Sequence, residues 1–374
     1  MIHRLNPTSP WVTGTLEIIQ QFIQQPVLFL EQDDVSVDQA TWSVNLTRID
    51  DKIKSLNINC IVIDATMNPE IFTADCYQQV PKQKIIEDLN KICSSYYVTS
   101  DYEYFYKPSQ CIKFFPAFLW TISSQQVDQY FPEASYRRYA TSYDAEITKT
   151  HALMCLNRNM SWHRLYLFSL LVEQTWFDKI TYSFLNSIGN RCDAFVIKQN
   201  LTSQEIEKIL SHEHKLPIMS RSELSLDKTQ IPIMWMHGAS SIHLSDYQTH
   251  AINLVTETSL TEGIILTEKT CKPFMAYQIP IILGPIGANQ FLQDVGLDMF
   301  EDFVPWREWD QEPNHKLKIQ RIVEFLHELM STSDAENAIL SIHKKFHSRL
   351  IYNRQHFFSR EFRTLLSTQI SNLA

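Results

Sequence analysis

Glycine is scarce in this sequence, and its scarcity argues against two common classes of nucleotide-binding protein. Only seven of the 374 residues are glycine, and Gly14 is the only one that precedes Gly189. Neither G-x-G-x-x-G nor G-x-x-x-x-G-K-[ST] occurs anywhere in the chain. The sequence therefore argues against a dinucleotide-binding Rossmann enzyme and a P-loop NTPase. Any phosphate recognition must use helix N-termini and basic side chains instead.

A basic excess, cysteine pairs in motifs and long apolar runs are also missing. The net charge of −9 argues against a general nucleic-acid-binding protein. The seven cysteines are odd in number and form no C-x-x-C, as is typical of chains in a reducing cytosol. No apolar run approaches the roughly 20 residues of a membrane span, and the N-terminal segment lacks the apolar stretch of a signal peptide. We therefore expect a cytoplasmic protein of two ordinary-sized domains.

Continuous apolar runs alternate with helical patterns, which is typical of buried parallel strands. In the first third, strands are predicted over 26–30, 58–63 and 96–99, each followed by acidic residues, and helices over 14–24 and 83–93. Later strands are predicted over 152–156, 194–197, 231–236, 252–255 and 279–283. Later helices are predicted over 162–174, 203–212, 241–250, 316–332 and 334–366.

Residues 254–300 are the most informative segment, part of a predicted strand–loop–helix–strand unit that begins with the apolar run 252–255. The first strand ends at Glu257, Thr267 is a suitable N-cap for the helix, and Pro273 should keep that helix short or kinked. Open α/β sheets bind ligands in the crevice outside the carboxyl ends of their strands. Glu257, at such an end, would bind a sugar hydroxyl.

The first turn of the predicted helix carries opposite charges. Lys269, together with the positive end of the helix dipole, would suit a diphosphate. Glu268 would accept hydrogen bonds from ribose hydroxyls. The plainer alternative is an ordinary capped helix with a solvated Glu-Lys pair.

A second polar group follows the strand predicted over 152–156. Asn157 and Arg158 come at its carboxyl end, and His163 and Arg164 fall in the first turn of the next helix. Cations in a first turn oppose the helix dipole, and a bound anion would remove that conflict. The alternative is that Arg164 points away and pairs with a surface carboxylate.

These two groups carry a resemblance to a known enzyme class. An acidic residue after a strand, Thr267-Glu268-Lys269, a short helix and the run Ile279–Leu283 resemble the donor-binding half of GT-B glycosyltransferases. The pattern is closest to that of α1,3-fucosyltransferases and bacterial polysaccharide glycosyltransferases. Residues 155–164 look like the segment that opens the nucleotide-binding domain of bacterial members.

The resemblance implies an α/β fold with two Rossmann-like parallel-sheet domains that face a cleft. An acceptor-side domain is expected over 1–145, a nucleotide-sugar-binding domain over 146–340, and a C-terminal helix that crosses back over 341–374. The nucleotide sugar is a substrate, and neither a cofactor nor a metal is expected. The residues implied in donor binding are Asn157, Arg158, His163, Arg164, Thr267, Glu268 and Lys269.

An inverting sugar transfer also needs a base that takes a proton from the acceptor hydroxyl. The resemblance places this group in the first domain, where acidic residues follow the predicted strands. The candidates are Glu31, Asp33, Asp34, Asp64 and Asp101, and the residues themselves do not choose among them. The E-x7-E spacing of many retaining GT-B enzymes is absent, so the stereochemical course stays open.

The expected function is transfer of a sugar from a nucleotide sugar to a saccharide or lipid-linked glycan in lipopolysaccharide or capsule biosynthesis. A GDP-fucose-dependent fucosyltransferase is the alternative within the class. A non-catalytic glycan-binding protein and an epimerase-like hydrolase are the alternatives outside it. Basic residues flank an apolar face of the C-terminal helix, formed by Ile342, Phe346, Leu350 and Phe357. This face would either touch anionic lipid at the inner side of the plasma membrane or pack across the domains.

Overall fold

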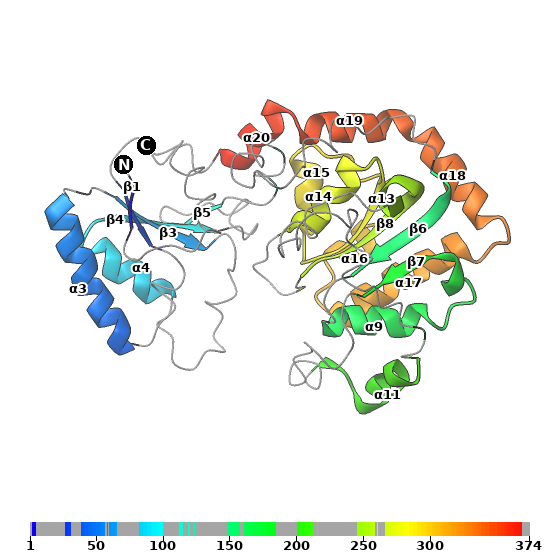
Figure 1. The fold of residues 1–374 in the computed structure, drawn as a ribbon, viewed down its shortest axis with the longest axis horizontal. Helices are drawn as coiled ribbons and strands as arrows, with labels where there is room; N and C mark the ends of the chain where they lie inside the picture. The colour runs from blue at the N-terminus through cyan, green and yellow to red at the C-terminus, as the bar shows by residue number, and fades with distance from the viewer. Residues whose placement is uncertain are drawn as a thin grey trace, which may run out of the picture. The chain divides into compact units, whose positions relative to one another are not determined.

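The chain forms two compact units, shown in the computed structural model of Figure 1. One unit holds Met1–Gln126, Glu262–Leu266 and Arg360–Ala374, and the other holds Val127–Thr261 and Thr267–Ser359. The structure describes residues 2–4, 27–30, 39–56, 58, 60–65, 82–99, 112–114, 119, 123, 149–157, 161–184, 200–212, 215, 245–258, 260 and 266–368. The predicted domain boundary at 145/146 lies outside these residues, as do the segments 14–24, 194–197 and 231–236.

The first unit is built on a five-stranded parallel sheet in the order β1-β2-β3-β4-β5. Its elements are β1 (Ile2–Arg4), β2 (Val27–Leu30), α3 (Gln39–Leu56), β3 (Cys60–Ala65), α4 (Lys82–Asn90), β4 (Ser94–Thr99) and β5 (Ile112–Phe114). Leu28, Leu30 and Ile61 form a buried core with apolar residues of α3 and α4. Since parallel strands need crossover connections, this sheet is Rossmann-like, as predicted.

The second unit is built on a four-stranded parallel sheet in the order β7-β6-β8-β9. Its strands are β6 (His151–Leu156), β7 (Thr181–Ser183), β8 (His250–Thr256) and β9 (Ile279–Leu283). Its helices are α9 (Trp162–Leu171), the 3-10 helix η2 (Phe177–Lys179), α11 (Ser203–Ser211), α13 (Ser245–Thr249), α14 (Glu268–Met275), α15 (Ala288–Asp294), α16 (Arg307–Asp310), α17 (His315–Met330), α18 (Ala335–Lys345) and α19 (His347–Phe357). Every residue of β8 and β9 is buried, because helices cover both faces of the sheet.

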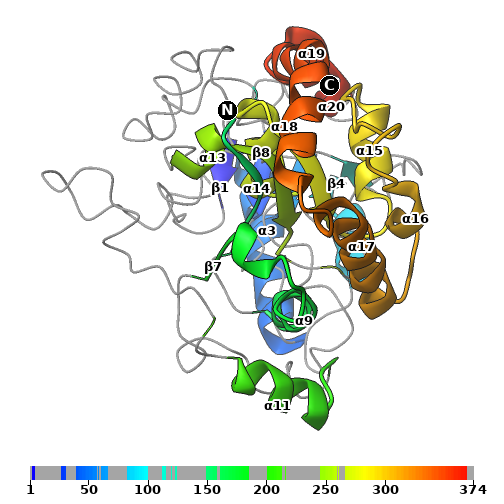
Figure 2. The ribbon, with the colours of Figure 1, turned by 90° about the vertical axis from the view of Figure 1, so that its right-hand side faces the viewer.

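The connections of the second sheet reverse direction between β6 and β8. The β6–α9–β7 crossover runs to one edge of the sheet, and the β8–α14–β9 crossover runs to the other. Since such crossovers are right-handed, α9 and α14 lie on opposite faces. Figure 1 shows α9 with α17 on one side of the sheet and α14 with α15 on the other, and Figure 2 shows α17 packed beside α9. The α/β class and the two parallel Rossmann-like sheets predicted from the sequence are therefore confirmed.

The single helix predicted over 334–366 is wrong, because the chain folds there as three helices. Helix α18 ends at Lys345, α19 ends at Phe357, and α20 (Arg360–Ser367) follows. Helix α20 belongs to the first unit, where the Arg363 guanidinium donates to the Ser123 carbonyl oxygen at 3.0 Å. The C-terminal segment therefore returns to the first unit, as expected.

The apolar face for which lipid contact and packing across the domains were the alternatives is largely buried in protein. Phe346, Leu350 and Phe357 are 7%, 2% and 1% exposed. The Phe357 ring stacks on Phe274 of α14, with 6.3 Å between ring centroids. Packing within the protein therefore accounts for this pattern, and membrane contact through this face gains no support. Within the described residues, no helix is long and apolar enough to cross a bilayer.

Candidate functional site

The point between β6 and β8 is where an open α/β sheet is expected to bind its ligand. Crossovers leave these two neighbouring strands in opposite directions, so their carboxyl ends flank a topological switch point. The predicted donor-binding residues that the structure describes lie around this point, on the segments that follow β6 and β8. Residues about a hundred positions apart in the chain therefore meet here.

The Glu257 carboxylate ties the end of β8 to the first turn of α14. The side chain is completely buried, and it accepts hydrogen bonds from the Thr267 amide at 3.0 Å and the Thr267 hydroxyl at 2.7 Å. The Thr258 amide donates at 3.3 Å, and the Thr270 hydroxyl also donates. All these contacts are within the chain, so they point to a positioning role for Glu257. A direct contact with a sugar stays a prediction.

His163 and Arg164 hold the end of β8 from the other side of the switch point. Both are 2% exposed. The His163 Nε2 atom lies 3.0 Å from the Glu257 carbonyl oxygen, and the Arg164 guanidinium donates to the carbonyl oxygens of Thr256 at 2.9 Å and Glu257 at 3.1 Å. For Arg164 the predicted conflict with the α9 dipole is thus relieved by the carbonyl oxygens at the end of β8, and His163 is neutral because burial lowers its pKa to about 3. A bound anion is not needed to explain their positions, and phosphate contact by either residue stays a prediction.

Asn157 completes this buried floor. It is 3% exposed, its amide oxygen accepts from the Thr256 hydroxyl, and its side-chain amide donates to the Cys155 sulfur at 3.4 Å. Asn157 therefore links the ends of β6 and β8. Arg158, predicted beside it, lies outside the described residues.

The first turn of α14 carries the charged groups that remain partly accessible. Lys269 and Glu268 side chains are 20% and 14% exposed, and the Lys269 ammonium lies 3.0 Å from the Glu268 carboxylate. The same ammonium donates to the hydroxyls of Thr267 at 3.1 Å and Thr258 at 3.4 Å. Burial alone would raise the pKa of Glu268, but Lys269 and Lys272 outweigh it, so the pKa is lowered and the carboxylate is anionic. The predicted Thr-Glu-Lys group is thus assembled at the switch point.

The amide groups at the starts of α14 and α15 both have partners within the chain. Asp310 closes α15, because its carboxylate accepts from the amides of Asn289 at 3.0 Å and Gln290 at 3.1 Å. At α14 the Thr267 amide donates to the Glu257 carboxylate at 3.0 Å, and the Thr267 hydroxyl accepts a long bond, 3.4 Å, from the Lys269 amide. The helix dipole and Lys269 favour an anion at the start of α14.

Lys318 is a buried residue at this edge that the sequence reading did not identify. Its ammonium donates to the carbonyl oxygens of Gly284 at 3.1 Å and Asp310 at 3.2 Å, so it supports the loop after β9. Burial lowers its pKa to about 8, although Asp310 opposes this shift. Helical periodicity in the sequence indicates that Lys318 is buried, because it falls on the same face of α17 as Ile322 and Leu326.

The predicted catalytic bases are not placed by the structure. Glu31, Asp33, Asp34 and Asp101 lie outside the described residues. Asp64 was predicted to follow its strand. It instead lies inside β3, where it pairs with Val98 of β4. Within the described part of the chain, no group of three or more His, Cys, Asp or Glu side chains is placed to hold a metal ion.

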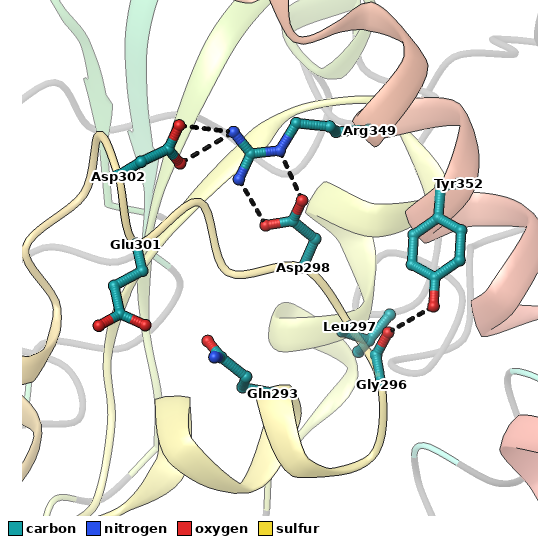
Figure 3. Close-up of a pocket in the computed structure, with 8 residues that line it drawn as sticks. All are labelled: Gln293, Gly296, Leu297, Asp298, Glu301, Asp302, Arg349 and Tyr352. Carbon is teal, nitrogen blue, oxygen red and sulfur yellow. Dashed lines mark hydrogen bonds and ion pairs between the residues drawn. The ribbon is translucent and has the colours of Figure 1, made fainter.

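A polar cavity of about 680 Å³ lies in the same unit, but none of its lining residues belongs to the predicted site. Figure 3 shows Arg349 between Asp298 and Asp302, and Tyr352 directed at the Gly296 carbonyl oxygen. Arg349 also lies over the Phe300 ring, 4.7 Å from its centroid. These polar groups already bond to one another, so the cavity wall is explained by local structure.

Two histidines, the buried His163 and the partly buried His343, predict loss of stability in acid. Burial, and then the charge of Arg164, lower the pKa of His163 to about 3. Burial also lowers the pKa of His343 to about 4, and its Nε2 atom lies 2.7 Å from the Tyr277 carbonyl oxygen. Histidines of the unfolded chain titrate near about 6.5. As pH falls from about 6.5 to 4, the unfolded state takes up protons that the folded state does not. The free energy of unfolding should therefore fall by about 1.4 kcal/mol per pH unit for each histidine.

Urea unfolding between pH 7 and pH 4.5 checks this expectation. His343→Gln keeps a donor for the Tyr277 carbonyl but cannot titrate, so it should remove one histidine's share of the slope. His327→Gln, at an exposed position of α17, is the matched control and should keep the wild-type slope. An identical slope in His343→Gln and wild type would contradict the assignment.

Comparisons with known proteins show a distant likeness in fold. No protein-family model matches the sequence, and no curated protein matches it significantly. One solved structure that the chain resembles is an alpha,alpha-trehalose-phosphate synthase (UDP-forming) from Burkholderia xenovorans in complex with glucose-6-phosphate. The two share 12% sequence identity over 93% of this chain and 76% of that chain, with a TM-score of 0.40. A likeness at this level assigns neither activity nor substrate.

Proposed function

We propose that this chain is a glycosyltransferase that takes its sugar from a nucleotide-sugar donor. The observation that carries the proposal is the charged first turn of α14, which the Glu257 carboxylate holds at the switch point between β6 and β8. The diphosphate of the donor would lie against the α14 amides and the Lys269 ammonium. Glu268 would accept hydrogen bonds from the ribose hydroxyls.

The reaction requires that the leaving diphosphate be stabilised while the acceptor is deprotonated. The bond between the anomeric carbon and the diphosphate oxygen breaks, the acceptor oxygen bonds to that carbon, and the acceptor proton passes to a base. Lys269 and the positive end of α14, worth about half a charge, would stabilise the diphosphate without a metal ion. His163 and Arg164 would act as positioning residues through the carbonyl oxygens at the end of β8, and Asn157 through the Thr256 hydroxyl.

The acceptor is proposed to be a saccharide or lipid-linked glycan of a surface polysaccharide, with GDP-fucose as an alternative donor. Thermal unfolding in the presence of a panel of nucleotide sugars tests the donor, since a ligand at 100 times its Kd adds about 2.7 kcal/mol of stability. Turnover assays with saccharide acceptors, run with and without EDTA, test transfer. Absence of any nucleotide-sugar binding would instead support a non-catalytic glycan-binding protein, and release of free nucleotide without an acceptor would support a hydrolase. If EDTA abolishes turnover and manganese restores it, a metal ion, and not Lys269, stabilises the leaving diphosphate.

Lys269→Ala is expected to weaken nucleotide-diphosphate binding about 10- to 100-fold, the effect of losing a charge-assisted hydrogen bond of roughly 1.5–3 kcal/mol. The melting temperature should also fall somewhat, because the mostly buried Glu268 carboxylate loses the ammonium that lies 3.0 Å away. Arg158→Ala is expected to act in the same direction. Isothermal titration calorimetry measures the affinities.

Lys344→Ala is the matched control for this experiment, because Lys344 is exposed near the end of α18. It removes the same charge from the same unit, and it should leave the affinity unchanged. Equal affinities in wild type, Lys269→Ala and Arg158→Ala would remove both residues from the site.

A further inference from the structure

Two aromatic rings stand at the carboxyl edge of the second sheet and have no role in the proposed chemistry so far. Trp162 is the first residue of α9 and His315 the first residue of α17, with 6.2 Å between their ring centroids. Both are only partly buried. Trp176, Trp306 and Trp309 are each at most 1% exposed. Among the tryptophans whose side chains the structure describes, Trp162 is thus the exception, and core packing alone does not account for it.

The aromatic pair lies beside the candidate site. The Trp162 ring meets the His163 ring edge-on at 5.7 Å, and His163 Nε2 lies 3.0 Å from the Glu257 carbonyl oxygen. His315 shares its helix with Lys318, which donates to the Gly284 carbonyl oxygen at the end of β9. The aromatic pair is therefore anchored to the ends of β6, β8 and β9.

His163 also relates this pair to the charged turn of α14. Its Nε2 atom lies 3.0 Å from the Glu257 carbonyl oxygen, and the Glu257 carboxylate accepts from the Thr267 hydroxyl, which lies 3.1 Å from the Lys269 ammonium. The aromatic pair and the proposed diphosphate site thus surround the same buried ring. A nucleotide bound through its diphosphate at Lys269 would extend its base away from that turn, and the partly exposed Trp162 ring stands beside His163.

We propose that Trp162 is the stacking platform for the base of the donor nucleotide, with His315 at its edge. This inference rests on the proposed function. A diphosphate site alone does not distinguish a nucleotide from inorganic pyrophosphate, and stacking on an aromatic ring supplies the missing affinity. Because every base has a π-face, the platform accepts purines and pyrimidines, and it sets affinity for nucleotides as a class.

The test compares two probes, inorganic pyrophosphate and the nucleoside diphosphate that wild type binds best. Trp162→Ala should weaken binding of the nucleoside diphosphate about 5- to 150-fold, the range measured for one stacked base. The Trp162→Ala variant should bind pyrophosphate with the same affinity as wild type. Trp162→Phe retains a ring and should recover most of the loss. Lys269→Ala should show the opposite pattern, with both probes weakened by a similar factor.

Several outcomes would overturn the inference, and they differ from failure of the proposed function. Unchanged nucleoside-diphosphate affinity in Trp162→Ala would exclude stacking. Equal loss of both probes in Trp162→Ala, together with a lower melting temperature, would assign the ring a purely structural role. If the alanine variant unfolds, Trp162→Phe keeps the test valid. Its affinity for the nucleoside diphosphate, divided by its affinity for pyrophosphate, must stay close to the wild-type ratio. If wild type binds pyrophosphate but no nucleotide, the platform is excluded, and if it binds neither, the proposed function fails as well.

Discussion

Glu257→Ala is expected to lower the free energy of unfolding of the second unit by about 3–5 kcal/mol, the usual cost of removing one member of a buried charged network. The substitution leaves the buried Thr267 amide without its acceptor, and it also removes the acceptor of the Thr258 amide. It also removes the negative charge that offsets part of the cost of burying Arg164. Urea unfolding followed by circular dichroism measures the loss.

Glu257→Gln separates shape from charge. The side-chain amide has nearly the volume of the carboxylate, but its NH2 group would face either the Thr267 amide with the Thr270 hydroxyl, or the Thr258 amide with the Thr267 hydroxyl. We therefore expect the free energy of unfolding of Glu257→Gln to lie between that of wild type and that of Glu257→Ala. Glu324→Ala, on the exposed side of α17, is the matched control and should change stability by less than about 0.5 kcal/mol. A loss below about 1 kcal/mol in Glu257→Ala would show that the carboxylate does not hold α14 to β8.

One acidic residue of the first unit should lower turnover about 10²- to 10⁴-fold when replaced by alanine, the usual contribution of general base catalysis. Of the acidic residues that the structure describes at the switch point, Glu257 bonds to Thr267 and Glu268 pairs with Lys269, so we expect the acceptor proton to pass to an acid of the first unit. Single alanine variants at the predicted positions are compared by steady-state turnover and by nucleotide binding. The positions are Glu31, Asp33, Asp34, Asp64 and Asp101.

The variant that lacks the catalytic base should lose turnover but bind nucleotide with wild-type affinity, and this combination identifies the base. Variants at the other four positions are internal controls, because each removes the same charge from the same unit. Asp64 is the least favoured position, since it lies within β3 and does not follow it. If all five variants stay active, the base lies outside this set or the reaction retains configuration. The anomeric configuration of the product, determined by NMR, separates these two cases.

Local sequence signals were sufficient for most buried strands and for the charged turn. Continuous apolar runs identified β2, β3, β4, β6, β8 and β9, because strands covered on both faces lose the alternation of an exposed sheet. Thr267 was identified as an N-cap, and α14 is short, as Pro273 predicted. The short strands β1, β5 and β7 have three residues each and carry too few apolar positions to produce a pattern. The long C-terminal helix was predicted wrongly because its helical periodicity continues through the breaks near Phe346 and Phe358.

The sequence by itself determined which residue types stand at the ends of the strands and at the start of α14, since these depend on neighbours a few positions away. Only the tertiary structure decided what each of them contacts. Glu257 turns back onto Thr267, Arg164 reaches the carbonyl oxygens of β8, and Asp310 closes α15. These partners lie between 10 and 92 residues apart in the chain. A buried charge must find hydrogen-bond partners wherever packing places them, and no local pattern encodes that choice.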